Sequence, residues 1–185
     1  MFKNALDLCK NYLYNIVKED DVVIDATVGN GNDTLFLKKL VGNGGKVYGF
    51  DIQKQSIINT KKLLEENNEE SNVELILDSH SELDKYIKEN VKAVVFNLGY
   101  LPGGDHSIKT MPETTILAVE KSLEILEKDG IICMVIYHGG DSGFYEKDAL
   151  MEYFKRLNSK EITVITHKFI NQINNPPILA IIFKK

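Results

Sequence analysis

Two acidic residues and a glycine-rich turn between them have the spacing of a cofactor-binding unit in an α/β protein. An apolar run ends in Asp25, and Gly29-Asn30-Gly31 follows just before a predicted helix from Asn32. Glycines suit such a strand-to-helix turn because the backbone bends sharply and a ligand can approach where a Cβ would stand. A second apolar run ends in Asp51, about twenty residues after the glycines, where a carboxylate can accept hydrogen bonds from a ribose diol. The pattern predicts a cofactor that contains adenosine.

The turn lacks one glycine that a nicotinamide-binding fingerprint would contain. In the pattern G-x-G-x-x-G the third glycine lets the helix pack closely on the strand beneath a pyrophosphate, and Thr34 stands there instead. The loop is also acidic and polar, at Asp25, Asn30, Asn32 and Asp33, which suits a positively charged ligand better than a diphosphate. S-adenosylmethionine carries an ammonium and a sulfonium and no phosphate, so the sequence favours this cofactor. A purely structural turn beside a buried strand is the alternative.

The composition indicates one globular domain that spans residues 1–185. Hydrophobic residues make up 43% and charged residues 26% of the chain, the balance of a soluble protein, and no apolar run approaches the roughly 20 residues that cross a bilayer. Cys9 and Cys133 lie far apart, so we expect reduced core thiols and a cytoplasmic protein with no membrane partner. The net charge of −5 disfavours a nucleic-acid partner unless a local basic patch exists. The oligomeric state is left open, with a homodimer as one alternative.

Strands and helices alternate through most of the chain. We predict strands over 22–26, 46–51, 73–77, 91–97 and 130–137, and helices over 2–17, 32–41, 54–66, 82–90, 111–128 and 145–158. Near-continuous apolar strands such as 131–136 indicate burial on both faces, as in a parallel sheet. Strands spaced by helices form right-handed βαβ units, which gives a doubly wound sheet with helices on both faces.

The end of the chain departs from this repeat. After the last predicted helix, the runs EITVITHKF and ILAIIFKK are separated only by INQINNPP. No helix fits into that connection, so the two final strands should be antiparallel. A mostly parallel sheet of seven strands with an antiparallel last strand is the Rossmann-like architecture of class I methyltransferases.

Polar residues follow the third and fifth predicted strands, at the edge where open α/β sheets bind ligands. After the third strand come Asp78, Ser79 and His80, where methyltransferases commonly place groups that meet the adenine ring. The alternative is that a side chain here simply caps the following helix. After the fifth strand come Tyr137 and His138, followed by glycines. A histidine at this edge is either structural or part of the site.

The segment FNLGYLPGGDHS, which follows the fourth strand, is the most unusual in the chain. Its residues Asn97 to Tyr100 stand where amino-methylating enzymes carry an Asn/Asp-Pro-Pro-aromatic tetrapeptide, with Leu98 and Gly99 replacing both prolines. In such a loop, an amide oxygen and a backbone carbonyl accept hydrogen bonds from an amine, and the aromatic ring stacks on a flat substrate. A glycine-rich turn before a helix is the alternative. The ionisable residues of these loops are His80, Asp105, His106 and His138. Their spacing matches no metal-ligand motif, so we predict no metal site.

Taken together, DATVGNGNDT, the Asp-Ser-His triplet, NLGYLPGGD and YHGG resemble the motifs of a small bacterial methyltransferase family, over the whole chain. Its members were long labelled rRNA methylases and are now associated with tRNA, in which they methylate the 5-aminomethyl group of 5-aminomethyl-2-thiouridine at the wobble position. The resemblance implies S-adenosyl-L-methionine as the cofactor and the tRNA anticodon loop as the partner. NLGYLPGGD is its specific element, because many methyltransferases share the first motif.

The resemblance also implies roles for individual residues. Asn30 and Asn32 are expected near the methionine moiety and Asp51 at the ribose hydroxyls. The residues expected to bind the cofactor are Asp25, Thr27, Gly29, Asn30, Gly31, Asn32, Asp51, Ile52, Gln53, Asp78, Ser79, His80 and Asn97. The residues expected to act in catalysis are Asn97, Tyr100, Asp33, Asp105 and His138, the last of which is displaced from the histidine of the family pattern.

The implied reaction is in-line transfer of a methyl group from a sulfonium to a primary amine, with most of the catalysis supplied by positioning. The amine must be neutral to attack, and Asp33, Asp105 or His138 could accept its proton. Binding of the anticodon loop would stack splayed bases on aromatic rings. Phosphates would need lysines gathered on one rim, for which the candidates are Lys3, Lys10, Lys109 and Lys168.

Other functions fit parts of the sequence. A methyltransferase that acts on rRNA or on a small-molecule amine has the same cofactor motif, and a small substrate suits the acidic charge better. An NAD-dependent oxidoreductase is disfavoured by the missing third glycine and the reversed final strands. A non-catalytic adenosylmethionine-binding module is disfavoured by the intact loop from Asn97 to Tyr100.

Overall fold

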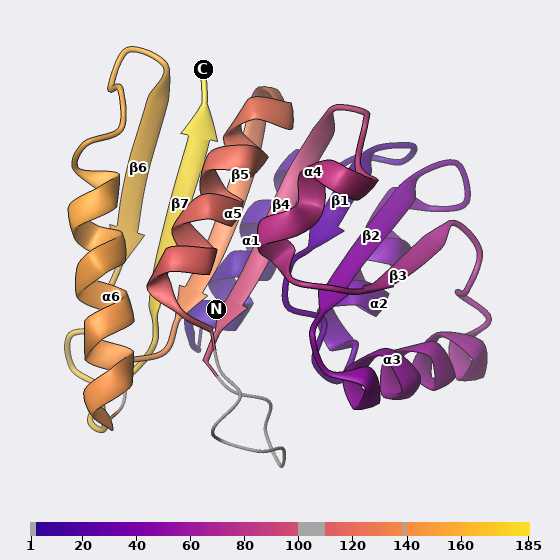
Figure 1. Cartoon of the computed structure of the whole chain (residues 1–185), viewed down its shortest axis with the longest axis horizontal. Coiled ribbons are helices and arrows are strands. Elements are labelled where there is room, and N and C mark those ends of the chain that lie inside the picture. The colour runs from indigo at the N-terminus through magenta and orange to yellow at the C-terminus, as the bar shows by residue number, and fades with distance from the viewer. Residues whose placement is uncertain (1–2, 100–109, 139) are drawn as a thin grey trace.

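Seven strands form one sheet in the order β3-β2-β1-β4-β5-β7-β6 (Figure 1). The structure is a computed structural model, and it describes residues 3–99, 110–138 and 140–185. The strands are β1 (Val22–Asp25), β2 (Lys46–Asp51), β3 (Val73–Leu77), β4 (Val91–Leu98), β5 (Leu126–Ile136), β6 (Ile162–His167) and β7 (Ile178–Lys184). The first five strands pair in parallel, and β7 is antiparallel to both β5 and β6. The predicted Rossmann-like sheet with a reversed last strand is confirmed.

Helices cover both faces of this sheet, as Figure 1 shows. On one face α1 (Ala5–Ile16) and α2 (Asn32–Val41) pack against a core cluster that includes Val23, Val95 and Cys133. On the other face α5 (Pro112–Ile125) and α6 (Gly140–Phe154) cover a cluster that includes Ile24 and Phe96. The helix α3 (Lys54–Asn67) lies against β2, β3 and α2. Adjacent residues of one strand thus enter opposite cores, which explains the near-continuous apolar runs.

The order of the strands places a crevice at the centre of the sheet. The chain runs outward from β1 to β2 and β3, and then returns to add β4 on the other side of β1. The connections that leave β1 and β4 at their carboxyl ends therefore turn to opposite sides, and ligands of open α/β sheets bind where this reversal occurs. Asp25 ends β1, and Asn97 lies one residue before the end of β4, so the fold brings these two motifs to one edge.

Two predicted helices are displaced by several residues: the one expected over 145–158 is α6, Gly140–Phe154, and the boundary between α5 and β5 also differs. A helix was expected over 111–128, but α5 ends at Ile125 and β5 already begins at Leu126, which pairs with Val91 of β4. The strand register then shifts before Ile131, and Asp129 adopts a positive φ of 58° within this bulge. The charged run Glu127–Asp129 resembles an exposed helix end in the sequence, whereas the pairing with β4 decides its conformation.

The predicted helix over 82–90 is also much shorter in the structure. A 3₁₀ turn at His80–Glu82 leads into α4 (Leu83–Tyr86), and no helical residue follows before β4. The ammonium of Lys121 in α5 holds this short element by donating to the carbonyl of Ser81 and to the carboxylate of Asp84, both at 2.6 Å. Across the described residues, no helix is long and apolar enough to cross a membrane.

Candidate active site

The first carboxylate of the glycine-rich motif lies beneath its loop. Asp25 is fully buried, and its carboxylate accepts hydrogen bonds from the Thr34 hydroxyl at 2.6 Å and from the Thr27 backbone N–H at 3.2 Å. Burial, followed by the nearby charge of Asp33, raises the pKa of Asp25 to about 7. Asp25 therefore fixes the shape of the loop from below, and its charge rather than a direct contact can act on a ligand.

The two glycines of the loop adopt backbone angles that favour glycine. Gly29 has φ of 56° and Gly31, the N-cap of α2, has φ of 82°. A Cβ on Gly31 would lie only 2.6 Å from the hydroxyl oxygen of Thr60 in α3, so the close approach of α3 also excludes a larger residue. The side chains of Asn30 and Asn32 are exposed on either side of Gly31, where they can reach a ligand.

Asp51, at the end of β2, faces the same loop. Its carboxylate accepts the backbone N–H of Gly29 at 2.9 Å and that of Gln53 at 2.8 Å. These bonds hold the two loops together, and each carboxylate oxygen keeps a further lone pair for a ligand hydroxyl. Asp51 is half-buried. The structure thus brings the two halves of the predicted cofactor motif to one side of the crevice.

Apolar side chains stand exposed beside this carboxylate. Ile52 is 58% exposed and Leu77 is 53% exposed, and Leu77 pairs with Asp51 in the parallel register of β2 and β3. The neighbouring Asp78 accepts a hydrogen bond from the Tyr86 hydroxyl at 2.8 Å, and this bond lowers the pKa of Asp78. Exposed apolar groups next to Asp51, the acid predicted to bind the ribose, can flank a purine ring. Leu77 was not among the predicted site residues, because its strand ending gave no polar signal.

Ser79 and His80 have structural partners. The Ser79 side chain accepts the backbone N–H of Ser81 and caps the 3₁₀ turn. The His80 ring packs edge-on against Phe96, and its Nδ1 lies 3.1 Å from the carbonyl oxygen of Ala26. Burial lowers the pKa of His80, which favours the neutral form of the ring. Both residues lie at the ligand-binding edge, and their contact with an adenine ring remains a prediction.

Asn97 and Asp33 form the central contact of the crevice. The side-chain Nδ2 of Asn97 donates a hydrogen bond to Oδ2 of Asp33, in the first turn of α2. The other oxygen of Asp33 forms an ion pair with Lys10 of α1 at 3.3 Å. A carboxylate can only accept hydrogen bonds, so this contact fixes which way the Asn97 amide points. Asn97 Oδ1 is buried and has no hydrogen-bond partner among the described residues.

The backbone of Asn97 is fixed as well. Its N–H donates to the hydroxyl of Thr27 at 2.7 Å, which ties the end of β4 to the glycine-rich loop. Thr27 is thus a positioning residue between the two predicted motifs. The result is an immobilised amide whose carbonyl oxygen has an unused acceptor. Such an oxygen can orient a hydrogen-bond donor of a substrate, for example an amine.

Tyr137 joins this group, although it was not chosen from the sequence. Its Cβ would lie 3.8 Å from a Cβ built on Gly99, and burial together with the charge of Asp33 raises its pKa. The ring is 43% exposed, so it stands at the rim of the crevice. Its position directly after β5 was visible in the sequence, but nothing there indicated that Asp33 would be its neighbour.

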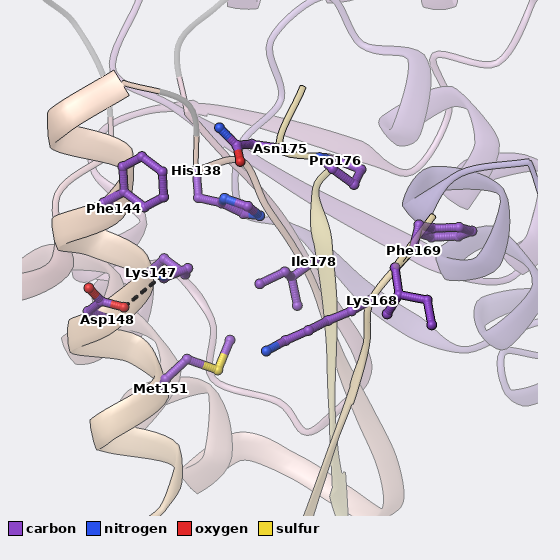
Figure 2. A pocket seen from close by; sticks show the side chains of 11 residues that line it. His138, Phe144, Lys147, Asp148, Met151, Lys168, Phe169, Asn175, Pro176 and Ile178 are labelled. Atoms are coloured by element: carbon purple, nitrogen blue, oxygen red, sulfur yellow. Dashed lines mark ion pairs between the residues drawn. The ribbon is translucent and has the colours of Figure 1, made fainter. Parts of the chain in front are cut away.

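His138 points elsewhere. It lines a separate cavity with residues of α6, and its ring centroid lies 5.8 Å from that of Phe144 (Figure 2). No contact with Asp33 or Asn97 is found for it within the described part of the chain, so its role as proton acceptor remains a prediction. The predicted catalytic residues Tyr100 and Asp105 lie outside the described residues, as does His106.

The two ends of the segment that follows β4 are held side by side. Gly99 and Thr110 exchange two hydrogen bonds, both at 3.0 Å. The Thr110 hydroxyl also donates to the buried carboxylate of Glu146 in α6 at 2.7 Å, and the Thr115 hydroxyl donates to the other oxygen at 2.9 Å. Glu146 therefore anchors the base of the NLGYLPGGD segment to two helices. It was missed in the sequence because its partners lie more than thirty residues away.

Comparison with known proteins identifies the family. A family model described as "Putative rRNA methylase" matches residues 47–183. The chain belongs to this methylase family. It is 37% identical over 195 residues to the chloroplastic tRNA (mnm(5)s(2)U34)-methyltransferase of Arabidopsis thaliana, an alignment that covers 99% of the chain and 70% of that protein.

Two solved structures of similar proteins cover the whole methylase chain and are themselves covered in full. A "putative rRNA-methylase" from Clostridium thermocellum is 54% identical, with a TM-score of 0.98. A "putative methyltransferase" from Streptococcus mutans, solved in complex with SAH, is 42% identical, with a TM-score of 0.92. The chain is thus an S-adenosylmethionine-dependent methyltransferase of the tRNA/rRNA methylase type with the class I fold.

The crevice of the methylase suits this cofactor. Asp33 and Asp51 place negative charge at the glycine-rich turn, and Asp25, whose pKa is about 7, adds to it when ionised. This charge favours a ligand that carries an ammonium and a sulfonium. Exposed Ile52 and Leu77 offer apolar surface beside Asp51, the acid predicted to bind the ribose.

Proposed function

We propose that the methylase transfers a methyl group to the 5-aminomethyl group of a wobble uridine in tRNA, giving 5-methylaminomethyluridine or its 2-thio form. The observation that carries the proposal is the fixed amide of Asn97, whose Nδ2 is bound to Asp33 and whose Oδ1 is buried and unpartnered among the described residues. An exocyclic aminomethyl group is a donor that satisfies such an oxygen. The 37% identity to a chloroplastic tRNA (mnm(5)s(2)U34)-methyltransferase supports the same reaction.

In this proposal the cofactor lies across the carboxyl ends of β1 to β4. Asp51 accepts hydrogen bonds from the ribose hydroxyls, and Ile52 and Leu77 flank the adenine. Asn30 and Asn32 are placed to meet the methionine moiety. When bound, the cofactor supplies an electrophilic methyl group on a sulfonium. The residues of the chain supply the positioning and an acceptor for the proton that the amine loses.

The Asn97 oxygen accepts one N–H of the substrate amine and thereby aims the nitrogen lone pair toward the methyl carbon. A bond forms between nitrogen and carbon while the carbon–sulfur bond breaks and its electrons stay on sulfur. One proton then leaves the methylated nitrogen. Asp33 lies against the same amide and is the candidate to receive it among the described residues, with Lys10 held at 3.3 Å on the far oxygen.

Two other substrates remain as alternatives with specific support. The family description favours rRNA. The net charge of −5 favours a small amine, because a small molecule needs no phosphate contacts. All three substrates use the same cofactor site, so only the acceptor distinguishes them.

Labelled methyl transfer decides among the acceptors. The purified protein is incubated with methyl-labelled S-adenosylmethionine and, in parallel, with tRNA that carries 5-aminomethyluridine, tRNA that lacks the amine, and rRNA. We expect label only in the aminomethylated tRNA, with 5-methylaminomethyluridine or its 2-thio form as the product in nucleoside mass spectrometry. Label in rRNA with none in aminomethylated tRNA would establish the rRNA alternative instead.

A further inference from the structure

A cavity of about 440 Å³ lies beside the crevice, between α6 and the connection from β6 to β7 (Figure 2). Figure 2 shows Phe144, Lys147 and Met151 projecting from α6 and Lys168 reaching across from the connection. Its size lies within the range of small-ligand pockets, about 300–1,000 Å³. Nothing in the reaction described above uses this cavity.

The cavity adjoins the reaction centre through two consecutive residues. Tyr137 lies by Gly99 and feels the charge of Asp33, whereas His138 lines the cavity. Their Cα atoms are about 3.8 Å apart, as in any trans peptide. A polymer that presents one unit to Asn97 can therefore place an adjacent unit in the cavity without a long span.

The charge of the cavity contrasts with that of the whole chain. Lys168 is exposed, and no ion pair within 4.0 Å is found for it in the described part of the chain. Lys147 pairs with Asp148 at 2.8 Å, and its ammonium also lies 5.1 Å from the centroid of the Phe144 ring. Two cations and one acid thus line the cavity, although the net charge of the protein is −5. This excess of cations favours an anionic group at Lys168.

The rim of the cavity is aromatic and apolar. The Phe144 ring is 39% exposed, and Ile170, in the β6–β7 connection, is 95% exposed. Ile173 in the same connection is 84% exposed. A flat ring laid against Phe144 would cover exposed apolar surface on α6 and on the β6–β7 connection. Base stacking on aromatic side chains is how proteins hold splayed RNA nucleotides.

We propose that this cavity holds a nucleotide of the RNA next to the one that is methylated, with its base against Phe144 and its phosphate at Lys168. The inference rests on the proposed function, since it requires RNA as the substrate. It explains how an acidic protein binds RNA with few phosphate contacts, because a single cationic and aromatic site supplies both stacking and charge. Specificity for the amine stays with Asn97.

Two variants with matched controls test the proposal. Lys168→Gln removes the cation after β6. Lys160→Gln removes an exposed lysine before the same strand, at the opposite end of β6. Phe144→Leu removes the ring, and Tyr145→Leu removes the adjacent ring, which is 60% exposed and whose hydroxyl lies 3.4 Å from Glu113. All four positions are exposed, so folding should survive each change.

The assay uses an anticodon stem-loop that carries 5-aminomethyluridine. We expect Lys168→Gln and Phe144→Leu to raise KM for the stem-loop by about tenfold, the order of one lost stacking or charge contact, while kcat and the affinity for S-adenosylmethionine stay unchanged. Lys168→Gln should also lower the slope of log affinity against log salt by about 0.7, the value for one phosphate of a single strand. The two control variants should match the wild type in every measurement.

A cross-link locates the neighbouring nucleotide directly. Stem-loops with 5-iodouridine on either side of the reactive uridine are irradiated, and we expect one of them to link to the peptide that contains Phe144 or to the peptide that contains Lys168. Normal KM values in both variants, or cross-links only to other peptides, would overturn the cavity assignment while methylation of the stem-loop stands. If the wild type does not methylate the aminomethylated stem-loop at all, the proposed function itself fails.

Discussion

Asn97 at the end of β4 donates its side-chain N–H to the carboxylate of Asp33 in the first turn of α2, across 64 residues of sequence. This contact joins the first turn of α2, which follows the glycine-rich loop, to the end of β4. It therefore links the residues proposed for the cofactor to those proposed for the substrate. Because Lys10 holds the other carboxylate oxygen, the amide cannot rotate without breaking a charge-assisted hydrogen bond. The acceptor face of Asn97 is fixed before any substrate arrives.

Loss of the Asn97 amide should reduce chemistry more than cofactor binding. We expect Asn97→Ala to lower kcat by roughly 100-fold, the order found when a reacting group is misplaced by about 1 Å, with the affinity for S-adenosylmethionine within about twofold of the wild type. Steady-state kinetics and calorimetry measure the two quantities separately. Asp33→Asn, which permits the Asn97 amide to turn over, should produce a smaller loss in kcat. Unchanged turnover in both variants would remove Asn97 from the mechanism.

Loss of the Asp51 carboxylate should weaken cofactor binding, both through the ribose and through the loops whose Gly29 and Gln53 N–H groups it accepts. Asp51→Ala removes a charge-assisted acceptor for the ribose and should weaken binding of S-adenosylmethionine by about 1.5–3 kcal/mol. Glu74→Ala on the neighbouring β3 is the control, because it removes an equal charge that pairs with Lys46 at 2.9 Å, outside the predicted site. Calorimetry on both variants gives the comparison. Equal affinity in Asp51→Ala and the wild type would mean that another group holds the ribose.

The sequence predicted the order of helices and strands well, because the helical spacing of apolar residues and the continuous apolar runs directly indicate which residues are buried. It failed where pairing between distant strands decides local conformation, as at Glu127–Asp129, whose charges look helical but which belong to β5. The candidate site likewise has residues that local sequence can identify and contacts that only tertiary packing determines. Asp51 could be chosen from its spacing to the glycines, whereas the pairing of Asp33 with Asn97 and the approach of Tyr137 depend on how β4, β5 and α2 pack.

Lys10 illustrates this limit. The sequence offered it only as one of four lysines that could meet phosphates, because nothing near it in the chain signals an ion pair. Its partner, Asp33, comes from another helix, and the pair forms because α1 and α2 lie on the same face of the sheet. Side-chain contacts across layers leave no trace in local periodicity.

The buried carboxylate of Glu146 should contribute to stability. Glu146→Ala removes the partner of two threonine hydroxyls, Thr110 and Thr115, and should lower the free energy of unfolding by about 2–3 kcal/mol, measured by urea denaturation. Glu152→Ala on the same helix is the control. Its exposed ion pair with Lys155 spans only three residues and should be worth less than about 1 kcal/mol. A similar loss in both variants would mean that Glu146 has no special role at the base of the segment.

Asp25 should make stability depend on pH in an unusual direction. Its pKa is about 7 in the folded protein, against an ordinary value of 3.8, so the folded state binds the extra proton between these values. The free energy of unfolding, measured relative to Asp25→Asn, should therefore fall as pH rises from about 4 to about 7 and stay level above that. In the variant, the amide can donate to Thr34 and accept from Thr27, so folding is retained. A difference that does not change with pH would mean that Asp25 titrates normally.

The same titration should discriminate between the cofactor and its product. S-adenosylmethionine carries one positive charge more than S-adenosylhomocysteine, at the sulfonium. Asp25 is mostly protonated at pH 6 and mostly ionised at pH 8, because burial and the charge of Asp33 raise its pKa to about 7. The ratio of the two affinities should then shift several-fold toward S-adenosylmethionine as pH rises, which isothermal calorimetry at several pH values can follow. Asp25→Asn isolates the effect, because the ligands' own titrations are the same with both proteins. An identical pH dependence in the wild type and in Asp25→Asn would show that the charge of Asp25 does not reach the sulfonium.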